Sequence, residues 1–349
     1  MKNLKVNKVR HFLRQKGIDA FLISPGANIR YLSGFTGTDS WLIITRSSQF
    51  FLGDFRFMLQ ARQEIDSNFE IIRIKESLSA TLLNLAVKNR IKSICFEPDK
   101  LSVHAFSRIK NRLGKNIRLL GIKDVLERQR QIKSPEEIIL IQKALAITKR
   151  AFELLKPFVK PKVTEIFLKN KLEMFLKAGG AHGLAFDPIV ASGPNAAMPH
   201  AKTTQRAIKP NEPVIIDAGV DYSGYKCDLT RTFFSGKITQ YITYYNILRY
   251  TQLSAIKKIK PHTPIALLEQ TVRQALKAKG LEQYFGHALG HGVGLEVHET
   301  PVISKKNNRK LMQAMVVTIE PGIYIPGSGG VRIEDMVLVT KTGYKILSK

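Results

Sequence analysis

The stretch PVIIDAGVDYSGYKCDLTRTFFSG, residues 213–236, joins two apolar segments through a polar turn and places one acid in each segment. The segments VIIDAGV and GYKCDLTRTFF are rich in β-branched and aromatic residues, and the DYSG at their junction predicts a β-hairpin. If the chain turns about residues 222–223, Asp217 and Asp228 lie opposite each other, about 4.5–5.5 Å apart at Cβ. Two ionised carboxylates at that separation repel, which predicts either a protonated acid or a cation between them.

A second stretch, VVTIEPGIYIPGSGGVRIEDMVLVT at residues 316–340, repeats this pattern. VVTIE and VRIEDMVLV predict strands, and PGSGG predicts a turn centred near Gly327. Glu320 and Glu334 are equidistant from that centre, so each strand again presents one acid to the other. Pro321 removes one ladder donor, so the pairing is expected to be imperfect there. One such hairpin is more often structural or solvent-facing, but two in the same chain favour a shared site.

Histidines are concentrated in GHALGHGVGLEVHET, residues 286–300, which holds His287, His291 and His298. Glycines on both sides of His291 let the imidazole approach a cluster closely and argue against a helix. The pair HE at 298–299 is not a zincin motif, because no second histidine follows at the required spacing. Taken singly, each histidine more often has an ordinary core or surface role.

One more histidine follows a strand and a turn in FDPIVASGPNAAMPHA, residues 186–201. His200 comes after proline in a loop, which makes it a candidate acid–base group. An exposed loop histidine without a catalytic role is the alternative interpretation.

Four carboxylates and an imidazole form a donor set that suits Mn²⁺ or Co²⁺, and also Zn²⁺. The absence of cysteine from this set argues against a closed structural zinc site. Bridging carboxylates favour two ions about 3.5–4 Å apart, an arrangement that activates a water between them.

Two domains are predicted, residues 1–125 and residues 126–349. In the first, short apolar runs alternate with helical periods, which is an α/β pattern. Near the boundary, Ser134 and Glu137 form a capping box and Pro135 fits the first helical position, so a helix is expected from there. The second domain combines helices with antiparallel hairpins, which is typical of an α+β fold.

The formal net charge of +27 is spread over both parts of the chain. This distribution favours a solvated basic surface, and a face that binds polyanions is the alternative. No apolar run approaches the roughly 18–20 residues of a membrane span, and the basic N-terminus predicts a helix instead of a signal peptide. The two cysteines lie far apart in the sequence and suggest no disulfide framework. We therefore expect a cytoplasmic protein without a membrane partner.

Taken together, five motifs resemble those of the pita-bread metallopeptidases, the family of aminopeptidase P, prolidase and methionine aminopeptidase. The motifs are SGPNAAMPHA, IDAGVDYSGYKCDLTRTF, GHGVGLEVHE, TIEPGIY and RIED. The first domain, with NIRYLSGFTG and LGDFRF, resembles the N-terminal domain of the creatinase, prolidase and aminopeptidase P branch. The resemblance implies a creatinase-like α/β domain followed by a pita-bread domain.

The resemblance also implies roles for particular residues. The implied metal ligands are Asp217, Asp228, His291, Glu320 and Glu334. Among them, Asp228 and Glu334 would bridge two divalent ions, with Mn²⁺ expected and Co²⁺ or Zn²⁺ as alternatives. The implied catalytic residues are His200, His298 and Glu320, and the implied substrate-side residues are His287 and Arg332. Creatinase lacks the ligands that this chain keeps, which argues against creatine hydrolysis.

The expected function is that of a metal-dependent Xaa-Pro aminopeptidase, which cleaves between an N-terminal residue and a following proline. Xaa-Pro dipeptidase (prolidase) is the alternative, because it shares the ligands and differs in a cationic clamp for the dipeptide carboxylate. A non-catalytic pita-bread protein that binds nucleic acid or histones is a further alternative, which the retained ligands disfavour. Peptides with proline at the second position are the expected substrates, and a homodimer is the family's usual state.

Overall fold

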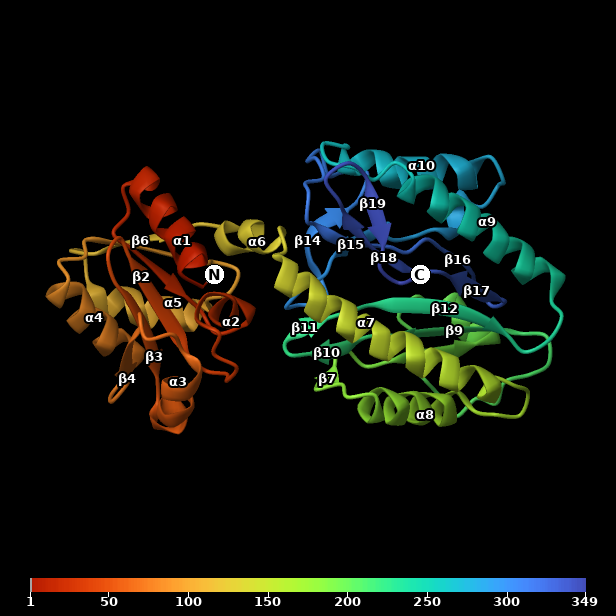
Figure 1. Ribbon diagram of the computed structural model, residues 1–349, viewed down its shortest axis with the longest axis horizontal. Helices are drawn as coiled ribbons and strands as arrows, with labels where there is room; N and C mark the ends of the chain where they lie inside the picture. Colours follow the sequence, from red (N-terminus) through yellow and green to blue (C-terminus); the bar gives the residue numbers. More distant parts are fainter. Residues whose placement is uncertain (1) are drawn as a thin grey trace. The chain divides into compact units, whose positions relative to one another are not determined.

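The computed structural model describes residues 2–349, which form two compact units divided between Arg130 and Gln131 (Figure 1). The boundary predicted from the sequence lies after residue 125. The helix α6 (Val125–Arg130) belongs with the first unit, because the Arg130 guanidinium donates to Asn28 at 2.8 Å and Leu126 is fully buried. Unit 1 therefore ends five residues beyond the end of the predicted first domain.

Unit 1 contains a mixed six-stranded sheet in the order β4-β3-β2-β1-β5-β6. Its strands are β1 (Ala20–Ile23), β2 (Trp41–Thr45), β3 (Gln49–Gly53), β4 (Glu70–Arg73), β5 (Ser93–Phe96) and β6 (Arg118–Gly121). Its other helices are α1 (Lys2–Lys16), α2 (Ala27–Ser33), the 3₁₀ turn Phe55–Phe57, α3 (Met58–Glu64), α4 (Leu78–Lys88) and α5 (Val103–Leu113). One core joins α4 and α5 to the central strands through buried side chains such as Leu22, Ile43, Leu82 and Ile109.

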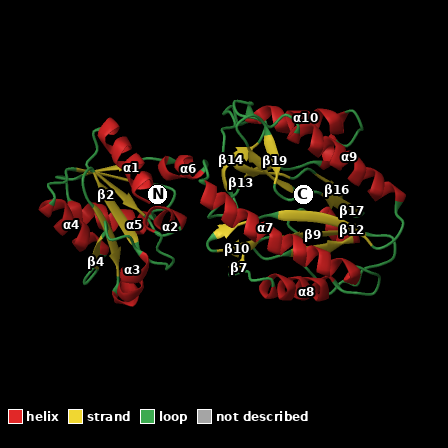
Figure 2. Ribbon diagram, viewed as in Figure 1, coloured by secondary structure: helices red, strands yellow, loops and turns green. Residues whose placement is uncertain are grey.

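Helices enclose the strands of unit 2 (Figure 2). The helices are α7 (Pro135–Leu155), α8 (Glu165–Ala178), α9 (Thr239–Ile256) and α10 (Ile265–Lys277). The predicted capping box is confirmed at the start of α7, where Ser134 accepts from the Glu137 amide and Glu137 accepts from the Ser134 amide. The pair α7 and α8 packs on β8 (Ile189–Ser192) and β10 (Val220–Tyr222). The pair α9 and α10 shares a core with β15 (Val316–Ile319) and β18 (Asp335–Val339).

All sheets of unit 2 are antiparallel. The shorter sheets contain β7 (Gly183–Leu184), β8 (Ile189–Ser192), β9 (Pro213–Ala218), β10 (Val220–Tyr222), β11 (Tyr225–Lys226), β12 (Leu229–Phe234), β16 (Gly322–Ile325) and β17 (Gly329–Arg332). The five-stranded sheet contains β13 (Gly290–Gly292), β14 (Glu299–Ile303), β15 (Val316–Ile319), β18 (Asp335–Val339) and β19 (Tyr344–Ile346). Across residues 2–349, no helix combines the length and the apolar character that a membrane crossing requires.

The first predicted hairpin exists, but it turns one residue later than expected. Asp217 pairs with Thr230, and the two-residue loop is Ser223-Gly224. Both loop residues have positive φ, 50° and 85°, which belongs to a type I′ turn whose twist matches the strands. The expected pairing of Asp217 with Asp228 was therefore wrong by two residues. A shift of two keeps a side chain on the same face of a sheet, so both acids still point to one side.

The second predicted hairpin has the expected register. Strand β15 pairs with β18 and β16 pairs with β17 about a centre at Gly327, whose φ is 74°. The pairing of the two strands is interrupted at Glu320 and Pro321, which separate β15 from β16. Glu334 lies in the break between β17 and β18 on the other side of the hairpin. The two glutamates therefore lie at equivalent places on the two strands, as predicted.

Candidate metal centre

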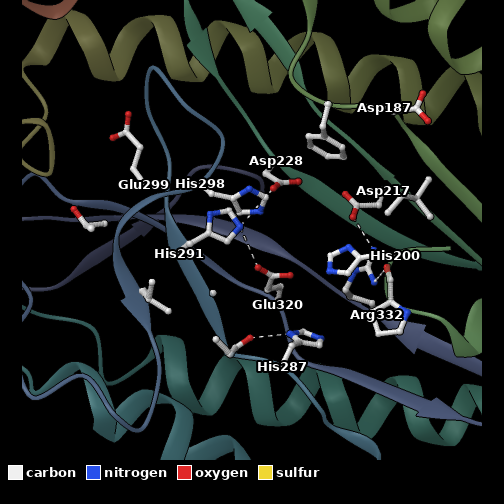
Figure 3. Close-up of a pocket in the computed structure, with 17 residues that line it drawn as sticks. Asp187, His200, Asp217, Asp228, His287, His291, His298, Glu299, Glu320 and Arg332 are labelled. Atoms are coloured by element: carbon white, nitrogen blue, oxygen red, sulfur yellow. Dashed lines mark hydrogen bonds and ion pairs between the residues drawn. The ribbon is translucent and has the colours of Figure 1, made fainter. Parts of the chain in front are cut away.

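A cavity of about 630 Å³ lies within unit 2 (Figure 3). It is lined by Phe186, Asp187, Ile189, Pro199, His200, Asp217, Asp228, His287, Ala288, Gly290, His291, His298, Glu299, Thr300, Val302, Glu320 and Arg332. Eight of the nine site residues predicted from the sequence are among them. The ninth, Glu334, is 1% exposed and lies beneath the cavity floor beside Asp228.

Five elements bring the predicted ligands together. Asp217 belongs to β9, and Asp228 directly precedes β12. Glu320 follows β15, Glu334 directly precedes β18, and His291 is the middle residue of β13. Four of these residues thus stand at or beside a strand end, where side chains from neighbouring sheets converge.

The donor atoms form three overlapping groups, one of which joins Asp228 and His291 to His298. One oxygen each of Asp217, Asp228 and Glu334 lie within 4.8 Å of one another. A nitrogen of His291 and one oxygen each of Glu320 and Glu334 satisfy the same limit. Glu334 belongs to the last two groups, so two cations held by these donors would share it.

The carboxylates repel one another. Burial raises the pKa of Asp228 well above its usual value, and the charges of Glu334 and Asp217 raise it further. Burial likewise raises the pKa of Glu334, with added repulsion from Glu320 and Asp217. Three buried oxygens, Oδ1 of Asp217, Oδ1 of Asp228 and Oε1 of Glu334, have no hydrogen-bond partner in the structure. Such orphaned acceptors are costly unless a cation neutralises them, so the residues fit divalent metal ions.

His291 has a defined orientation. Its Nδ1 lies 3.0 Å from the Gly292 carbonyl, which only accepts, so Nδ1 bears the proton. Its Nε2 faces Glu320 Oε1 at 3.2 Å and Asp228 Oδ2 at 3.6 Å. Burial alone would lower the pKa of His291, but the hydrogen bond and charge of Glu320 outweigh it and raise that pKa. The neutral form would direct the Nε2 lone pair at the carboxylates, as a metal ligand requires.

Arg332 orients the ligands and is itself buried, with 4% of its side chain exposed. Its Nη2 donates to Asp217 Oδ2 at 2.6 Å, and its Nη1 donates to the Tyr324 hydroxyl at 3.0 Å and to the Pro199 carbonyl at 3.1 Å. Its Nε donates to Thr230 Oγ1, which in turn donates to Glu334 Oε2 at 2.9 Å. Arg332 therefore fixes two ligands from behind, directly and through Thr230.

His287 lies on the opposite wall of the cavity from Asp228 (Figure 3). Its Nδ1 is 2.8 Å from the Ala288 carbonyl, and its Nε2 is 3.0 Å from the Tyr324 hydroxyl. Burial lowers the pKa of His287, so the ring is neutral near pH 7 and donates from Nδ1. Its Nε2 then accepts a hydrogen bond from the Tyr324 hydroxyl, so both nitrogens of the His287 ring are hydrogen-bonded.

His298 and His200 are exposed and line the cavity mouth. The His298 ring lies edge-on to the His291 ring with centroids 4.3 Å apart, and a nitrogen of it lies within 4.8 Å of donor atoms of Asp228 and His291. Burial lowers the pKa of His298, and the charges of His291 and His200 add to the effect of burial. The sequence predicted both residues as acid–base groups, and both are placed where a bound substrate could reach them.

Comparison with known proteins identifies the family. Residues 139–341, more than half of the chain, match metallopeptidase family M24. The chain belongs to metallopeptidase family M24. Residues 5–132 match the Creatinase/Prolidase N-terminal domain, so the predicted fold, a creatinase-like domain followed by a pita-bread domain, is confirmed. The protein is therefore a metallopeptidase, and the cavity is its candidate metal centre.

Proteins named for each of the two expected activities resemble this chain. The Xaa-Pro dipeptidase of Pyrococcus horikoshii is 34% identical, and the match covers 99% of this chain and 97% of that protein. A structure of an Xaa-Pro dipeptidase from Bacillus anthracis has a TM-score of 0.96 at 34% identity and covers 100% of this chain and 98% of that one. A structure of an X-Pro aminopeptidase from Thermotoga maritima has a TM-score of 0.91 at 34% identity, with 99% and 97% coverage. Equal identity to both kinds means that overall similarity does not separate the two activities.

Sequence reasoning missed three residues of this M24 site. Thr230 connects the proposed ligand Glu334 to Arg332, and Tyr324 connects His287 to Arg332. Lys133 reaches the loop beside His298 through Glu299. Thr230 could have been found by its strand position, two residues after Asp228 on the same face. Tyr324 could have been found by its place in the motif TIEPGIY. For Lys133 the sequence offered no comparable signal, because its partner lies 166 positions away along the chain.

Proposed function

We propose that this metallopeptidase is a dinuclear Xaa-Pro aminopeptidase. Asp217, Asp228, His291, Glu320 and Glu334 would hold two divalent ions, with Asp228 and Glu334 shared between them. Glu334 belongs to two of the donor groups, and Asp228 belongs to one of these and to a third with His291. These groups and the three orphaned oxygens support the assignment. When bound, the ions supply Lewis-acid activation of the scissile carbonyl and lower the pKa of a water molecule. Mn²⁺ is the proposed ion, because oxygen donors dominate the set.

The residues of the chain would supply proton transfer and orientation. Glu320 stands beside His291 and could take a proton from the attacking water as well as bind an ion. His298 and His200 stand at the cavity mouth, where one can stabilise the tetrahedral oxyanion and the other can protonate the departing proline nitrogen. His287, neutral and held by Tyr324, would shape the wall against which the substrate lies.

The observation that favours an aminopeptidase over a dipeptidase is the absence of an uncommitted permanent cation in the cavity. Among the described residues that line it, Arg332 is the single lysine or arginine. Its guanidinium is buried and donates to Asp217, Tyr324 and the Pro199 carbonyl. A dipeptide carboxylate would therefore be desolvated without a charged partner, which is costly. A longer peptide places an amide at that position and extends past the open mouth.

Prolidase is the second candidate, because relatives with that name resemble the chain as closely. One assay separates the two. Protein loaded with Mn²⁺ is given Gly-Pro and Gly-Pro-Ala-Ala side by side, with metal-free protein as the control. We expect kcat/KM for the longer peptide to exceed that for Gly-Pro by about tenfold or more, the loss typical of one unpaired buried charge. Preference for Gly-Pro would establish a prolidase, and cleavage of neither would refute both proposals.

The remaining expectations stay predictions. The homodimer rests on the resemblance alone, and sedimentation of the purified protein would test it. The cytoplasmic location and the choice of Mn²⁺ among divalent ions likewise await measurement. A binding protein without catalytic activity is disfavoured because all five proposed ligands are present and converge.

A further inference from the structure

The position of His298 is not set by hydrogen bonds of its own ring. In the described part of the chain, the ring's close contact is with the ring of His291. The residue is exposed and precedes β14 directly. A catalytic side chain with so little direct support must be placed by its backbone. The contacts of the residues on either side of His298 therefore decide where its ring lies.

The side chain of Glu299, the residue after His298, makes a hydrogen bond within the same segment. Figure 3 shows its carboxylate turned away from the cluster formed by Asp228 and Glu320. Its Oε1 accepts from the Glu296 amide at 3.1 Å, which closes the chain before His298 into a tight loop. The carboxylate lies against Gly294, where an added Cβ would come within 2.7 Å of Oε2. Gly294 is thus the residue that leaves room for this carboxylate.

The other oxygen of Glu299 meets a buried ammonium. Lys133 Nζ lies 3.0 Å from Glu299 Oε2, and the exposed fractions of the two side chains are 2% and 5%. Lys133 is itself fixed, because its amide donates to the Ala314 carbonyl at 2.9 Å and the capped start of α7 follows at Ser134. The backbone of Lys133 is therefore held in place, and its buried ammonium contacts the loop from there.

A second contact from the same segment reaches the following residue. Gln131 Nε2 donates to Thr300 Oγ1 at 2.7 Å. The two residues after His298 are thus both held by the segment that enters α7. We name this set the linker clamp and define it as Gln131, Lys133, Glu299 and Thr300.

We propose that the linker clamp positions His298 for catalysis, with Lys133 and Glu299 as positioning residues. This inference rests on the catalytic role proposed for His298. A buried ion pair adds little net stability, because desolvation of both charges offsets their attraction, but it holds a fixed geometry. A displacement of about 1 Å in a catalytic group can lower the rate about 100-fold. The clamp therefore acts on kcat through the position of His298, while the Glu299 carboxylate is turned away from the proposed ligands.

A double-mutant cycle tests the coupling. The variants are Lys133→Met, Glu299→Gln and the two combined, each loaded with Mn²⁺ and assayed on Gly-Pro-Ala-Ala. We expect each single change to lower kcat about 10- to 100-fold with a smaller change in KM and unchanged metal content. The double variant should be no slower than the single variants, because the second change removes a contact already lost. It also removes both buried charges together, so it serves if a single variant does not fold.

A second measurement does not depend on activity. In the metal-free protein, the ring signal of His298 in a proton–carbon NMR spectrum is assigned with His298→Ala. The adjacent His291 ring shifts that signal, so the double variant should move it toward the position of a free histidine. The matched control is Arg206→Met with Glu212→Gln, which removes another partly buried ion pair of unit 2, outside the cavity lining. That control should leave both kcat and the His298 signal unchanged.

Three results would overturn the proposal. The double variant could keep kcat within about twofold of the parent. Glu299→Gln could lower kcat further in the Lys133→Met background, which would mean that Glu299 acts on the substrate directly. The His298 signal could stay in place when the clamp is removed. If the parent protein cleaves no Xaa-Pro peptide, the proposed function fails, while the NMR measurement still decides whether the clamp holds His298.

Discussion

The carboxyl groups at the metal centre differ in the direction in which the protein shifts their pKa values. Asp228 and Glu334 are buried with raised pKa values, and each has one orphaned oxygen. Burial also disfavours ionisation of Glu320, but the hydrogen bond and charge of His291 outweigh it and lower the pKa of that carboxyl. Asp228 and Glu334 thus need a cation to neutralise them, whereas Glu320 already has His291 as a partner.

The histidines at the cavity give the first prediction. His291→Ala should reduce metal content, because its Nε2 faces two carboxylates of the ligand cluster. His298→Ala and His200→Ala should keep about two ions per chain and lower kcat by roughly 10²–10⁴-fold, the usual size of an acid–base or oxyanion contribution. Elemental analysis and steady-state kinetics measure the two effects separately. Loss of metal from His298→Ala would make His298 a ligand, and full activity would make it a bystander.

Glu97 gives the second prediction, in unit 1. Burial, with added repulsion from Glu127, raises the pKa of Glu97 to about 8. An acid whose folded pKa exceeds its unfolded value binds more protons when folded, so stability falls as pH rises between about 4.5 and 8. The loss should reach a few kcal/mol for a shift of this size. Above the upper limit of that window no further loss is expected from this group.

The single tryptophan, Trp41, lies in β2 and reports the unfolding of unit 1 by fluorescence. Urea titrations across this pH range measure the effect. Glu97→Gln should flatten the pH dependence, because the amide does not ionise. The control Glu70→Gln changes an exposed carboxyl of the same sheet and should leave the dependence unchanged. An equal pH dependence in Glu97→Gln and the parent would contradict the assignment.

At the scale of elements, the site depends on where two hairpins turn. In the first hairpin the two strands approach each other closely beside Asp217 and Asp228. An added Cβ at Gly219 would come within 1.9 Å of the Cys227 carbonyl oxygen, so the strands meet there without a side chain between them. Asp217 and Asp228 flank this close approach. The turn therefore sets the distance between two proposed ligands.

The turn residues of that hairpin give the third prediction. Gly224 has a φ of 85° and donates its amide to Asp221 Oδ1 at 2.6 Å. Gly224→Val should destabilise unit 2 by about 1–2 kcal/mol, since a residue with a Cβ is strained at positive φ. Ser223→Asn should be neutral or slightly stabilising, because Asn-Gly is the preferred type I′ pair.

Thermal unfolding and metal titration of both variants measure the effect. Gly224→Val should also weaken metal binding, because slippage of the turn moves Asp228 relative to Asp217. Gly343→Val, at a glycine with open space around it and no positive φ, is the control for the added side chain. Unchanged metal affinity in a destabilised Gly224→Val protein would show that the register does not depend on the turn.

For the whole molecule, the net charge of +27 gives the fourth prediction. A solvated basic surface should bind duplex DNA weakly, with Kd about 10⁻⁴–10⁻⁶ M at physiological salt and no sequence preference. Fluorescence anisotropy with two unrelated duplexes, repeated at several salt concentrations, measures this. A sequence-selective complex roughly 10³-fold tighter would revive the nucleic-acid-binding alternative.

The sequence by itself predicted the fold class, the two-domain organisation and the five proposed ligands, from local patterns and from the family resemblance that those patterns carry. Strand and helix periods, the capping box at Ser134 and the turn at Gly327 are all readable over a few residues. The acids were recognisable because each interrupts an apolar strand, where a charge has no structural reason to be.

Only the tertiary structure decided the register of the first hairpin and the contacts behind the site. Two alternative turn centres one residue apart fit the same sequence, and the positive φ of Ser223 and Gly224 selects between them. Lys133 and Glu299 lie 166 positions apart. No local pattern links two such residues, because only the tertiary fold brings them within reach of each other.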